Sequence, residues 1–304
     1  MLKKAYLFTL VLVVSTFGPA DAGERVFAMV YPVINPFFEA TSRGAEDEAE
    51  RLGVEVLIKG PDRFDVQQQI AIVEELIERR VDGFGIGSVD PAKLTPYIDR
   101  AVEEGIKVVA FDSDAPLSKR IAYIGTNNFK AGEHMAHVLG TALGGKGEVL
   151  VSMGIPSQLN LKQRLQGLKY VLKNEYPDID LIDMQSGWGS HNLTLQCIEN
   201  MTEDFPDFAA LVGVDSFAGP AMLIVWKGKG LSQVAVTFDD LPETIGGVRN
   251  GQIYAAIVQR QYDWGVNVVR QLNDACAGIA IPENTDTGTL EITKTNVNEY
   301  YPEE

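Results

Sequence analysis

One short stretch of the chain combines an amide side chain with two aromatic rings. Asn35, Pro36, Phe37 and Phe38 come shortly after the apolar run 26–31. Aromatic faces can cover the carbon–hydrogen surface of a small polar ring, and an amide can donate to and accept from its hydroxyl groups. Two phenylalanines after a proline at a helix start are equally typical of core packing. The stretch alone therefore leaves a binding wall and a packed core as equal alternatives.

Polar side chains also follow other apolar runs, where strands are expected to end. Asp112, Ser113 and Asp114 follow the run 106–111, and Asp215 follows the run 209–213. A single aspartate after a strand is often a helix cap. Ligand sites of parallel sheets lie at the carboxyl ends of the strands, so four such ends favour one shared cleft. The strand-end set consists of Tyr31, Asn35, Asp112, Ser113, Asp114, Asp215, Asp239, Asp240, Gln259, Arg260 and Gln261.

The elements that must position these side chains alternate regularly along the chain. Strands are expected at 26–31, 54–58, 83–87, 106–111, 148–152, 179–183, 209–213, 233–238 and 253–258. Helices are expected at 36–51, 66–80, 91–104, 128–142, 160–174, 192–203, 217–227, 242–249 and 263–278. Apolar strands separated by helices indicate α/β architecture with parallel sheets covered on both faces. Because the rhythm restarts after 123–126, two doubly wound lobes of similar size are predicted.

The start of the chain and its charge indicate a secreted protein. Lys3 and Lys4 precede the apolar stretch 5–14, and Ala20-Asp21-Ala22 fits a small-x-small cleavage site. An apolar run this short predicts a signal peptide over residues 1–22, cleaved near Ala22, rather than a membrane span of ~20 residues. A buried N-terminal helix is the alternative. The net charge of −16 argues against binding to nucleic acid or anionic lipid.

Candidates for enzyme, metal or cofactor chemistry are weak. Segments 83–87 and 140–147 resemble nucleotide-binding loops in spacing alone, since neither lies between a strand and a helix. His134 and His137 stand three residues apart without an evident third metal ligand. Cys197 and Cys276 lie in helical segments, so buried free thiols are expected, with a disulfide as the alternative. We expect no catalytic residues, no metal and no cofactor, although a hydrolase with paired aspartates stays an alternative.

An ordered series of short stretches covers essentially the whole chain after the leader. The series is Asn35-Pro36-Phe37-Phe38, Val81-Asp82-Gly83-Phe84, Asp112-Ser113-Asp114-Ala115-Pro116, Tyr123-Ile124-Gly125-Thr126-Asn127, Arg164 with Gly167, Phe238-Asp239 and Gln259. In this order the chain resembles the periplasmic sugar-binding proteins of the ribose-binding type, the soluble components of ABC importers. The resemblance implies the type I periplasmic binding protein fold, with three crossings near 126–128, 259–262 and 284–288. The implied lobes are 23–126 plus 262–285 and 127–261 plus 286–304, which place the two cysteines in different lobes.

The resemblance also implies a set of ligand-binding residues. In the family, the residue matching Asn35 is an amide that forms hydrogen bonds with ligand hydroxyls. The residue matching Arg164 donates to ring oxygens, and the residue matching Trp188 is an aromatic that faces the ligand. The implied set is Tyr31, Asn35, Phe37, Phe38, Asp112, Ser113, Asn160, Arg164, Trp188, Asp215, Asp239 and Gln259. Two positions depart from the ribose-binding pattern: Ser113 stands where that pattern has arginine, and Asp215 where it has asparagine. These departures make ribose doubtful and favour a hexose, a polyol such as a cyclitol, or an amino-bearing ligand.

The implied function is capture of a neutral sugar or polyol in a cleft between the lobes, by a monomer that delivers it to an ABC permease. Signalling to a chemoreceptor or histidine kinase is the alternative output, because both partners would read the same closed surface. Whether Asp114 and Asp240 contact ligand or cap helices is left open.

Overall fold

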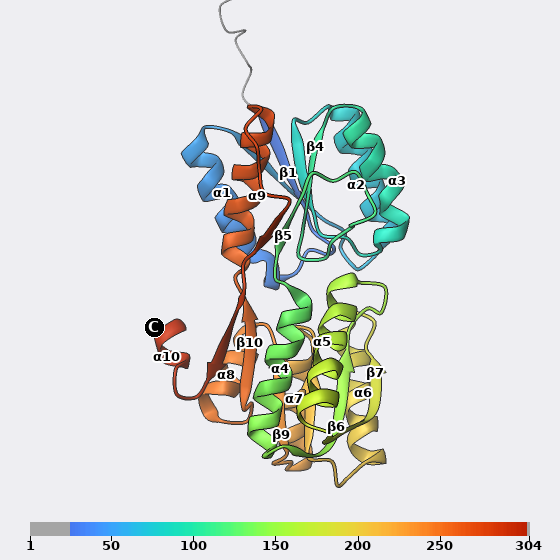
Figure 1. The fold of residues 1–304 in the computed structure, drawn as a ribbon, viewed down its shortest axis with the longest axis vertical. Coiled ribbons are helices and arrows are strands. Elements are labelled where there is room, and N and C mark those ends of the chain that lie inside the picture. Colours follow the sequence, from blue (N-terminus) through green and yellow to red (C-terminus); the bar gives the residue numbers. More distant parts are fainter. Residues whose placement is uncertain (1–24, 303–304) are drawn as a thin grey trace, which may run out of the picture.

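The computed structural model describes residues 25–302, so the predicted signal peptide and its cleavage site near Ala22 lie outside the described residues. The chain forms two α/β lobes stacked along the long axis of the molecule (Figure 1). We call the lobe that begins the described chain the first lobe and the other the second lobe. Among the described residues, no helix is long and apolar enough to cross a membrane.

The first lobe is built on a parallel six-stranded sheet of order β11-β5-β4-β3-β1-β2. Its strands are β1 (Val26–Val30), β2 (Glu55–Lys59), β3 (Gly83–Ile86), β4 (Lys107–Phe111), β5 (Ala122–Gly125) and β11 (Asn284–Asp286). Helices α1 (Glu39–Leu52) and α9 (Gln261–Cys276) cover one face, and α2 (Val66–Arg79) and α3 (Pro91–Glu103) the other. Alternate residues of β1 enter opposite cores, Phe27 with α1 and α9 and Ala28 with α2 and α3. The strand is apolar throughout because both of its faces are buried.

The second lobe has the sheet order β12-β10-β9-β8-β6-β7, which is parallel except for the antiparallel edge strand β12. Its strands are β6 (Lys146–Met153), β7 (Asp178–Ser186), β8 (Ala210–Gly213), β9 (Val234–Phe238), β10 (Ala255–Gln259) and β12 (Thr289–Thr293). Helices α4 (Asn128–Leu143) and α5 (Leu159–Glu175) cover one face. The other face packs against α6 (His191–Asp204), α7 (Ala218–Lys229), α8 (Pro242–Asn250) and the short α10 (Val297–Tyr300). The fold class predicted from the sequence is confirmed.

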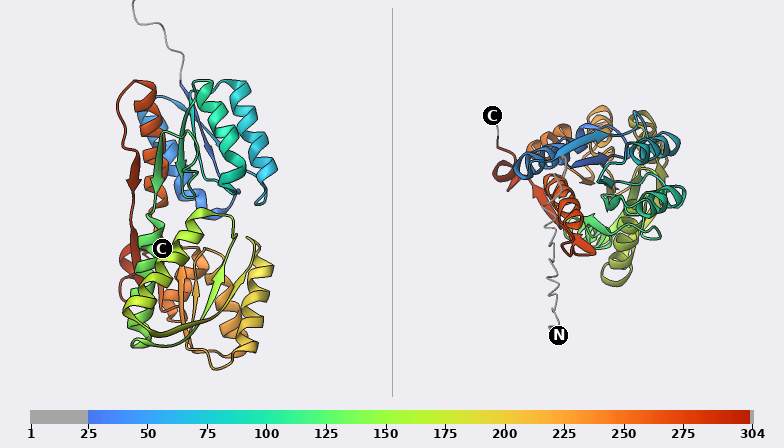
Figure 2. Two further views of the ribbon diagram at one scale, coloured as in Figure 1. Left: turned by 45° about the vertical axis from the view of Figure 1, so that its right-hand side comes forward. Right: turned by 90° about the horizontal axis from the view of Figure 1, so that it is seen from above.

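The chain passes three times between the lobes, on the side where Figure 2 shows green, orange and red segments running together. It leaves the first sheet after β5 to enter α4, returns from β10 to α9, and leaves again between β11 and β12. Strands β5, β11 and β12 were not among the strands predicted from the sequence. All three are short, and polar residues such as Thr285 and Glu291 interrupt the apolar pattern of β11 and β12, so periodicity alone does not reveal them.

Two local expectations need correction. The helix predicted from Pro36 is split into a 3-10 turn, Pro36–Phe38, and α1, which begins at Glu39. The backbone of Phe38 leaves the helical region at φ −91° and ψ 2°, and this break lets Phe37 and Phe38 point differently from α1. The cysteines are free, with Cys197 on α6 and Cys276 on α9, and both thiols are partly exposed rather than fully buried.

A buried carboxylate joins the two helices that cover one face of the first sheet. Glu48 of α1 is 4% exposed and accepts from Arg51 Nε and Nη2, each at 2.7 Å, and from Arg270 Nε of α9 at 2.8 Å. These charge-assisted hydrogen bonds hold the pKa of Glu48 at about 2. The stabilisation is therefore complete above the unfolded pKa of about 4.3 and is lost as the pH falls toward 2.

We expect Glu48→Gln to lower the free energy of unfolding at pH 7 by about 2 kcal/mol, because two guanidinium groups lose a charged acceptor. Urea denaturation measures this change. Glu50→Gln is the matched control, since Glu50 is exposed on the same helix. Equal stability of the two variants would contradict the role given to Glu48.

Candidate functional site

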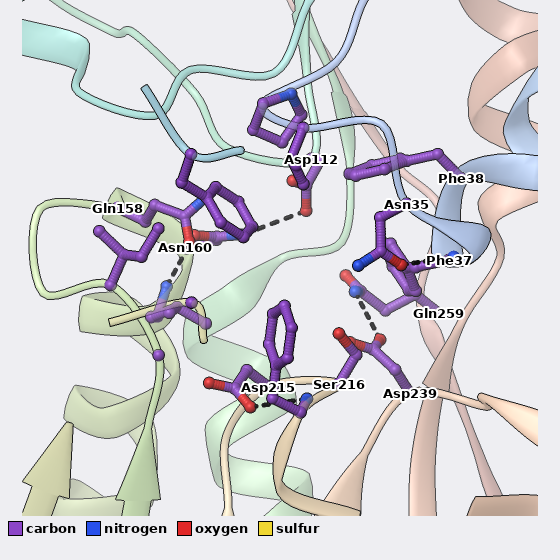
Figure 3. A pocket seen from close by; sticks show the side chains of 18 of the residues that line it. Asn35, Phe37, Phe38, Asp112, Gln158, Asn160, Asp215, Ser216, Asp239 and Gln259 are labelled. Carbon is purple, nitrogen blue, oxygen red and sulfur yellow. Dashed lines mark hydrogen bonds between the residues drawn. The ribbon is translucent and has the colours of Figure 1, made fainter. Parts of the chain in front are cut away.

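A cavity separates the carboxyl ends of the two sheets, and side chains from both lobes point into it (Figure 3). Its empty volume, including the open space at its mouth, is about 480 Å³. The residues that line it are Pro32, Val33, Asn35, Phe37, Phe38, Phe64, Asp112, Gly154, Ile155, Gln158, Asn160, Leu161, Arg164, Gly189, Asp215, Ser216, Phe217, Asp239 and Gln259. Nine of the residues predicted to bind ligand are among them.

A buried arginine organises the part of the cavity contributed by the second lobe. Arg164 of α5 is 2% exposed, and its guanidinium lies 3.8 Å from the ring centroid of Phe238. Its three nitrogens donate to neutral acceptors among the described residues. Nε donates to Asn128 Oδ1 at 2.8 Å, Nη1 to the Val214 carbonyl at 2.9 Å and Nη2 to Gln259 Oε1 at 3.0 Å. These bonds fix the guanidinium and occupy several of its donors.

Arg164 orients the side-chain amide of Gln259, and this amide in turn holds the carboxylate of Asp239. Gln259, the last residue of β10, donates from Nε2 to Asp239 Oδ1 at 2.9 Å. Asp239 directly follows β9 with φ 68°, a left-handed conformation that aspartate tolerates better than most residues. Burial raises the pKa of Asp239 to about 8, although the charge of Arg164 and the bond from Gln259 act in the opposite direction. The second carboxylate oxygen has no protein donor among residues 25–302.

One hydrogen bond crosses the cavity from lobe to lobe. Asn160 Nδ2 of α5 donates to Asp112 Oδ1 at 3.1 Å, and both residues are buried. Asp112 follows β4 in a left-handed conformation with φ 54°, and its carbonyl accepts from the Tyr123 hydroxyl at 2.9 Å. Burial raises the pKa of Asp112 to about 6, against the effects of Arg164 and Asn160. Because the bond from Asn160 occupies only Oδ1, the other carboxylate oxygen of Asp112, Oδ2, can accept a hydrogen bond from a further donor.

Asn35, Phe37 and Phe38 form part of the cavity wall on the first lobe. Asn35 caps the 3-10 turn because its Oδ1 accepts from the Phe37 amide at 2.9 Å. Its side-chain nitrogen is left facing the middle of the cavity (Figure 3). Phe38 stacks on Tyr31 with ring centroids 4.7 Å apart and packs edge-on against Phe111. The two phenylalanines therefore line the cavity and also pack against the core of the first lobe.

Three of the residues predicted to bind ligand do not line the cavity. Tyr31 lies behind Phe38, with its hydroxyl 2.7 Å from Ser42 Oγ. Ser113, in the loop after β4, is fully buried and does not line the cavity. Trp188, in the turn between β7 and α6, has a φ of 52°, is 63% exposed and does not line the cavity.

The two aspartates left open by the sequence have partners outside the cavity. Asp114 forms an ion pair with Arg120. Asp240 accepts from Gln261 Nε2 at 2.7 Å and from the Tyr301 hydroxyl at 2.7 Å. Neither lines the cavity.

Sequence reasoning missed an aromatic and polar rim. Phe64, from the loop before α2, and Phe217, at the start of α7, face each other across the lobes with centroids 6.1 Å apart. Ser157 Oγ donates to the Val89 carbonyl at 3.1 Å and makes a second contact between lobes. Gln158 follows β6, so the strand-end rule points to its loop, whereas no sequence signal identifies Phe64.

The arrangement is suited to binding a polar molecule. Three buried carboxylates, Asp112, Asp215 and Asp239, face one buried cation, Arg164, between apolar walls. No group of three or more metal-type side chains that could hold an ion occurs among residues 25–302. Amide, carboxylate and guanidinium groups beside aromatic faces match the hydroxyls and carbon–hydrogen faces of a sugar or polyol.

Comparisons with known proteins agree with this geometry. The family model described as "Periplasmic binding protein domain" matches residues 26–280. An ABC transporter solute binding protein from Burkholderia graminis, solved with D-arabinose, superposes with a TM-score of 0.89 at 34% identity, covering 92% of this chain and 99% of that one. The D-allose-binding periplasmic protein of Escherichia coli is 27% identical over 281 residues, 88% of each chain. The ribose import binding protein of Bacillus subtilis is 24% identical over 246 residues, 80% of this chain and 79% of its own.

The pKa of Asp239 predicts how stability without ligand depends on pH. A carboxyl whose pKa rises from about 3.9 in the unfolded chain to about 8 in the fold stabilises the protein fully below the lower value. This contribution is lost progressively as the pH rises from the lower value to the higher one, because the unfolded state ionises first and the folded state must bury a charge to follow. We expect the urea midpoint to fall between pH 6 and pH 8, and Asp239→Asn to reduce that fall. An identical pH profile for both proteins would contradict the assignment.

Proposed function

The chain belongs to the periplasmic binding protein family, and on this basis we propose that it captures a sugar or polyol between its lobes and delivers it to an ABC importer. The observation that carries the proposal is the meeting of buried polar side chains from both lobes in one cavity. A soluble scaffold does not need three buried carboxylates and a buried guanidinium for stability, since each costs solvation free energy. A polar ligand offsets that cost by supplying the missing hydrogen bonds.

The proposed ligand contacts combine the two sides of the cavity. Asn35 and Asp112 belong to the first lobe, and Arg164, Asp239 and Gln259 to the second. Phe37 and Phe38 cover the ring faces, and Phe64 and Phe217 narrow the mouth. The remaining contacts in the proposed set come from Asn160, Gln158 and Asp215. The relatives named for ribose and allose, and the relative solved with D-arabinose, support a monosaccharide as the ligand class.

Binding is coupled to closure of the lobes. Contacts made to both lobes at once favour the closed arrangement, because only that arrangement satisfies all of them. The three crossings act as the hinge between a lobe of residues 23–126 plus 262–285 and a lobe of residues 127–261 plus 286–304. The closed form is the one that the permease recognises. Secretion by the signal peptide of residues 1–22 brings the protein to the periplasm, where ligand and permease meet.

Calorimetric titration with pentoses, hexoses and cyclitols tests the function directly. At least one monosaccharide or cyclitol is expected to bind, and small-angle scattering should show a smaller radius of gyration in its presence because the lobes close. Absence of binding across the whole panel would overturn the proposal.

Replacing Asp239 by Ala should weaken binding of that ligand by about 2 kcal/mol or more, roughly 30-fold, because a buried hydroxyl loses its acceptor. Calorimetry gives both affinities. Asp180→Ala is the matched control, since Asp180 is exposed on β7 and does not line the cavity. Unchanged affinity of Asp239→Ala would remove Asp239 from the ligand contacts.

A further inference from the structure

The carboxylate of Asp240 accepts hydrogen bonds from two side chains that lie far apart in the chain. Gln261, the first residue of α9, donates from Nε2 to Oδ1 at 2.7 Å. Tyr301, near the end of the described chain, donates from its hydroxyl to Oδ2 at 2.7 Å. Each carboxylate oxygen therefore has a donor, and the side chain of Asp240 is held in one orientation.

The residue before Asp240 is the one that needs this support. Asp239 lines the cavity and has a φ of 68°. Aspartate tolerates this left-handed conformation better than most residues, but the conformation is still unfavourable and persists only where the surroundings fix it. On the amino side, the Asp239 amide donates to the Ile257 carbonyl of β10 at 2.8 Å. On the carboxyl side, the chain is fixed by the side chain of Asp240.

The residues after β12, 294–302, form a C-terminal segment that is anchored to the second lobe. Arg249 of α8 donates from Nη2 to the Tyr301 carbonyl at 2.7 Å and from Nε to Asn298 Oδ1 at 3.2 Å. Val297 is buried in the core beside α8, and the ring of Tyr301 packs against the same core. Burial and the charge of Asp240 raise the pKa of Tyr301 above its usual range, so its hydroxyl is a donor at neutral pH.

The two aspartates are thus held by neighbouring parts of the structure. Gln259 and Gln261 stand two residues apart at the second crossing, and they donate to Asp239 and Asp240 respectively. Figure 3 shows the bond between Gln259 and Asp239 at the cavity wall. The last donor, the Tyr301 hydroxyl, comes from the C-terminal segment, which lies outside the residues 26–280 that match the family model.

We propose that Tyr301 is a positioning residue for the ligand cavity: through Asp240 it holds Asp239 in the conformation that presents the Asp239 carboxylate to the ligand. This inference rests on the proposed function and makes the affinity depend on the C-terminal segment. Tyr301 itself does not line the cavity. The competing role for its hydroxyl is general support of the second lobe. In that case its loss would weaken binding by the same factor with and without the Asp239 carboxylate.

The experiment removes the hydroxyl alone and measures affinity by calorimetry at pH 7.5. The ligand is whichever of D-arabinose, D-ribose, D-allose, D-galactose and myo-inositol binds the native protein most tightly. Tyr301→Phe should weaken its binding about tenfold, because Asp239 is no longer held toward it. Tyr300→Phe is the matched control, since Tyr300 is the preceding residue and is 44% exposed. The control should bind within about twofold of the native protein.

A second background separates positioning from general support. In Asp239→Ala the carboxylate that Tyr301 positions is absent, so adding Tyr301→Phe should change the Kd by less than about twofold. Asp240→Asn tests the same link from its other end, because an amide has one acceptor oxygen where the carboxylate has two. It should show the same loss in the native background and the same lack of effect in Asp239→Ala. Urea denaturation establishes that each variant is folded.

Native affinity in folded Tyr301→Phe and Asp240→Asn proteins would overturn the inference. A loss of equal size in the native and Asp239→Ala backgrounds would also overturn it, because Tyr301 would then support the lobe without positioning Asp239. Both results leave the proposed function intact. Failure of every compound to bind the native protein would instead overturn the proposed function, and this inference with it.

Discussion

The site depends on one buried guanidinium that the protein surrounds with neutral acceptors. Arg164 links α5 to α4 through Asn128, to the end of β8 through Val214 and to β10 through Gln259. Because its protein partners carry no charge, its positive charge stays available to the carboxylates around it, and it lowers the pKa of Asp112, Asp215 and Asp239 relative to burial alone. Gln259 in turn orients Asp239, so one side chain positions much of the second-lobe wall.

The cavity consequently has more acceptors than donors. One oxygen each of Asp112 and Asp239 is occupied by a protein amide, and one oxygen of Asp215 by backbone amides. The other oxygens of Asp112 and Asp239 accept no hydrogen bond from a described side chain, and Arg164 already spends three donors on the protein. A polyhydroxylated ligand supplies donors to such a surface, whereas an anionic ligand would add like charge to it.

Some contacts between the two lobes involve no ligand. The bond from Asn160 to Asp112, the bond from Ser157 to Val89 and the facing rings of Phe64 and Phe217 all join the two lobes. These contacts stabilise the arrangement of the lobes in this structure. In the closure that we propose, the ligand supplies only the remaining free-energy difference between the open and closed states.

The sequence by itself determined the alternation of apolar strands and helices, and therefore the two doubly wound sheets, because periodicity is a local property. It also located the polar strand ends that supply Asn35, Asp112, Asp239 and Gln259. Only the tertiary structure decided which side chains face the cavity: Trp188 follows a strand as Asp239 does, yet it points to solvent. The physical reason is that side-chain direction and free lone pairs depend on backbone dihedrals and on partners far along the chain, which no local pattern contains.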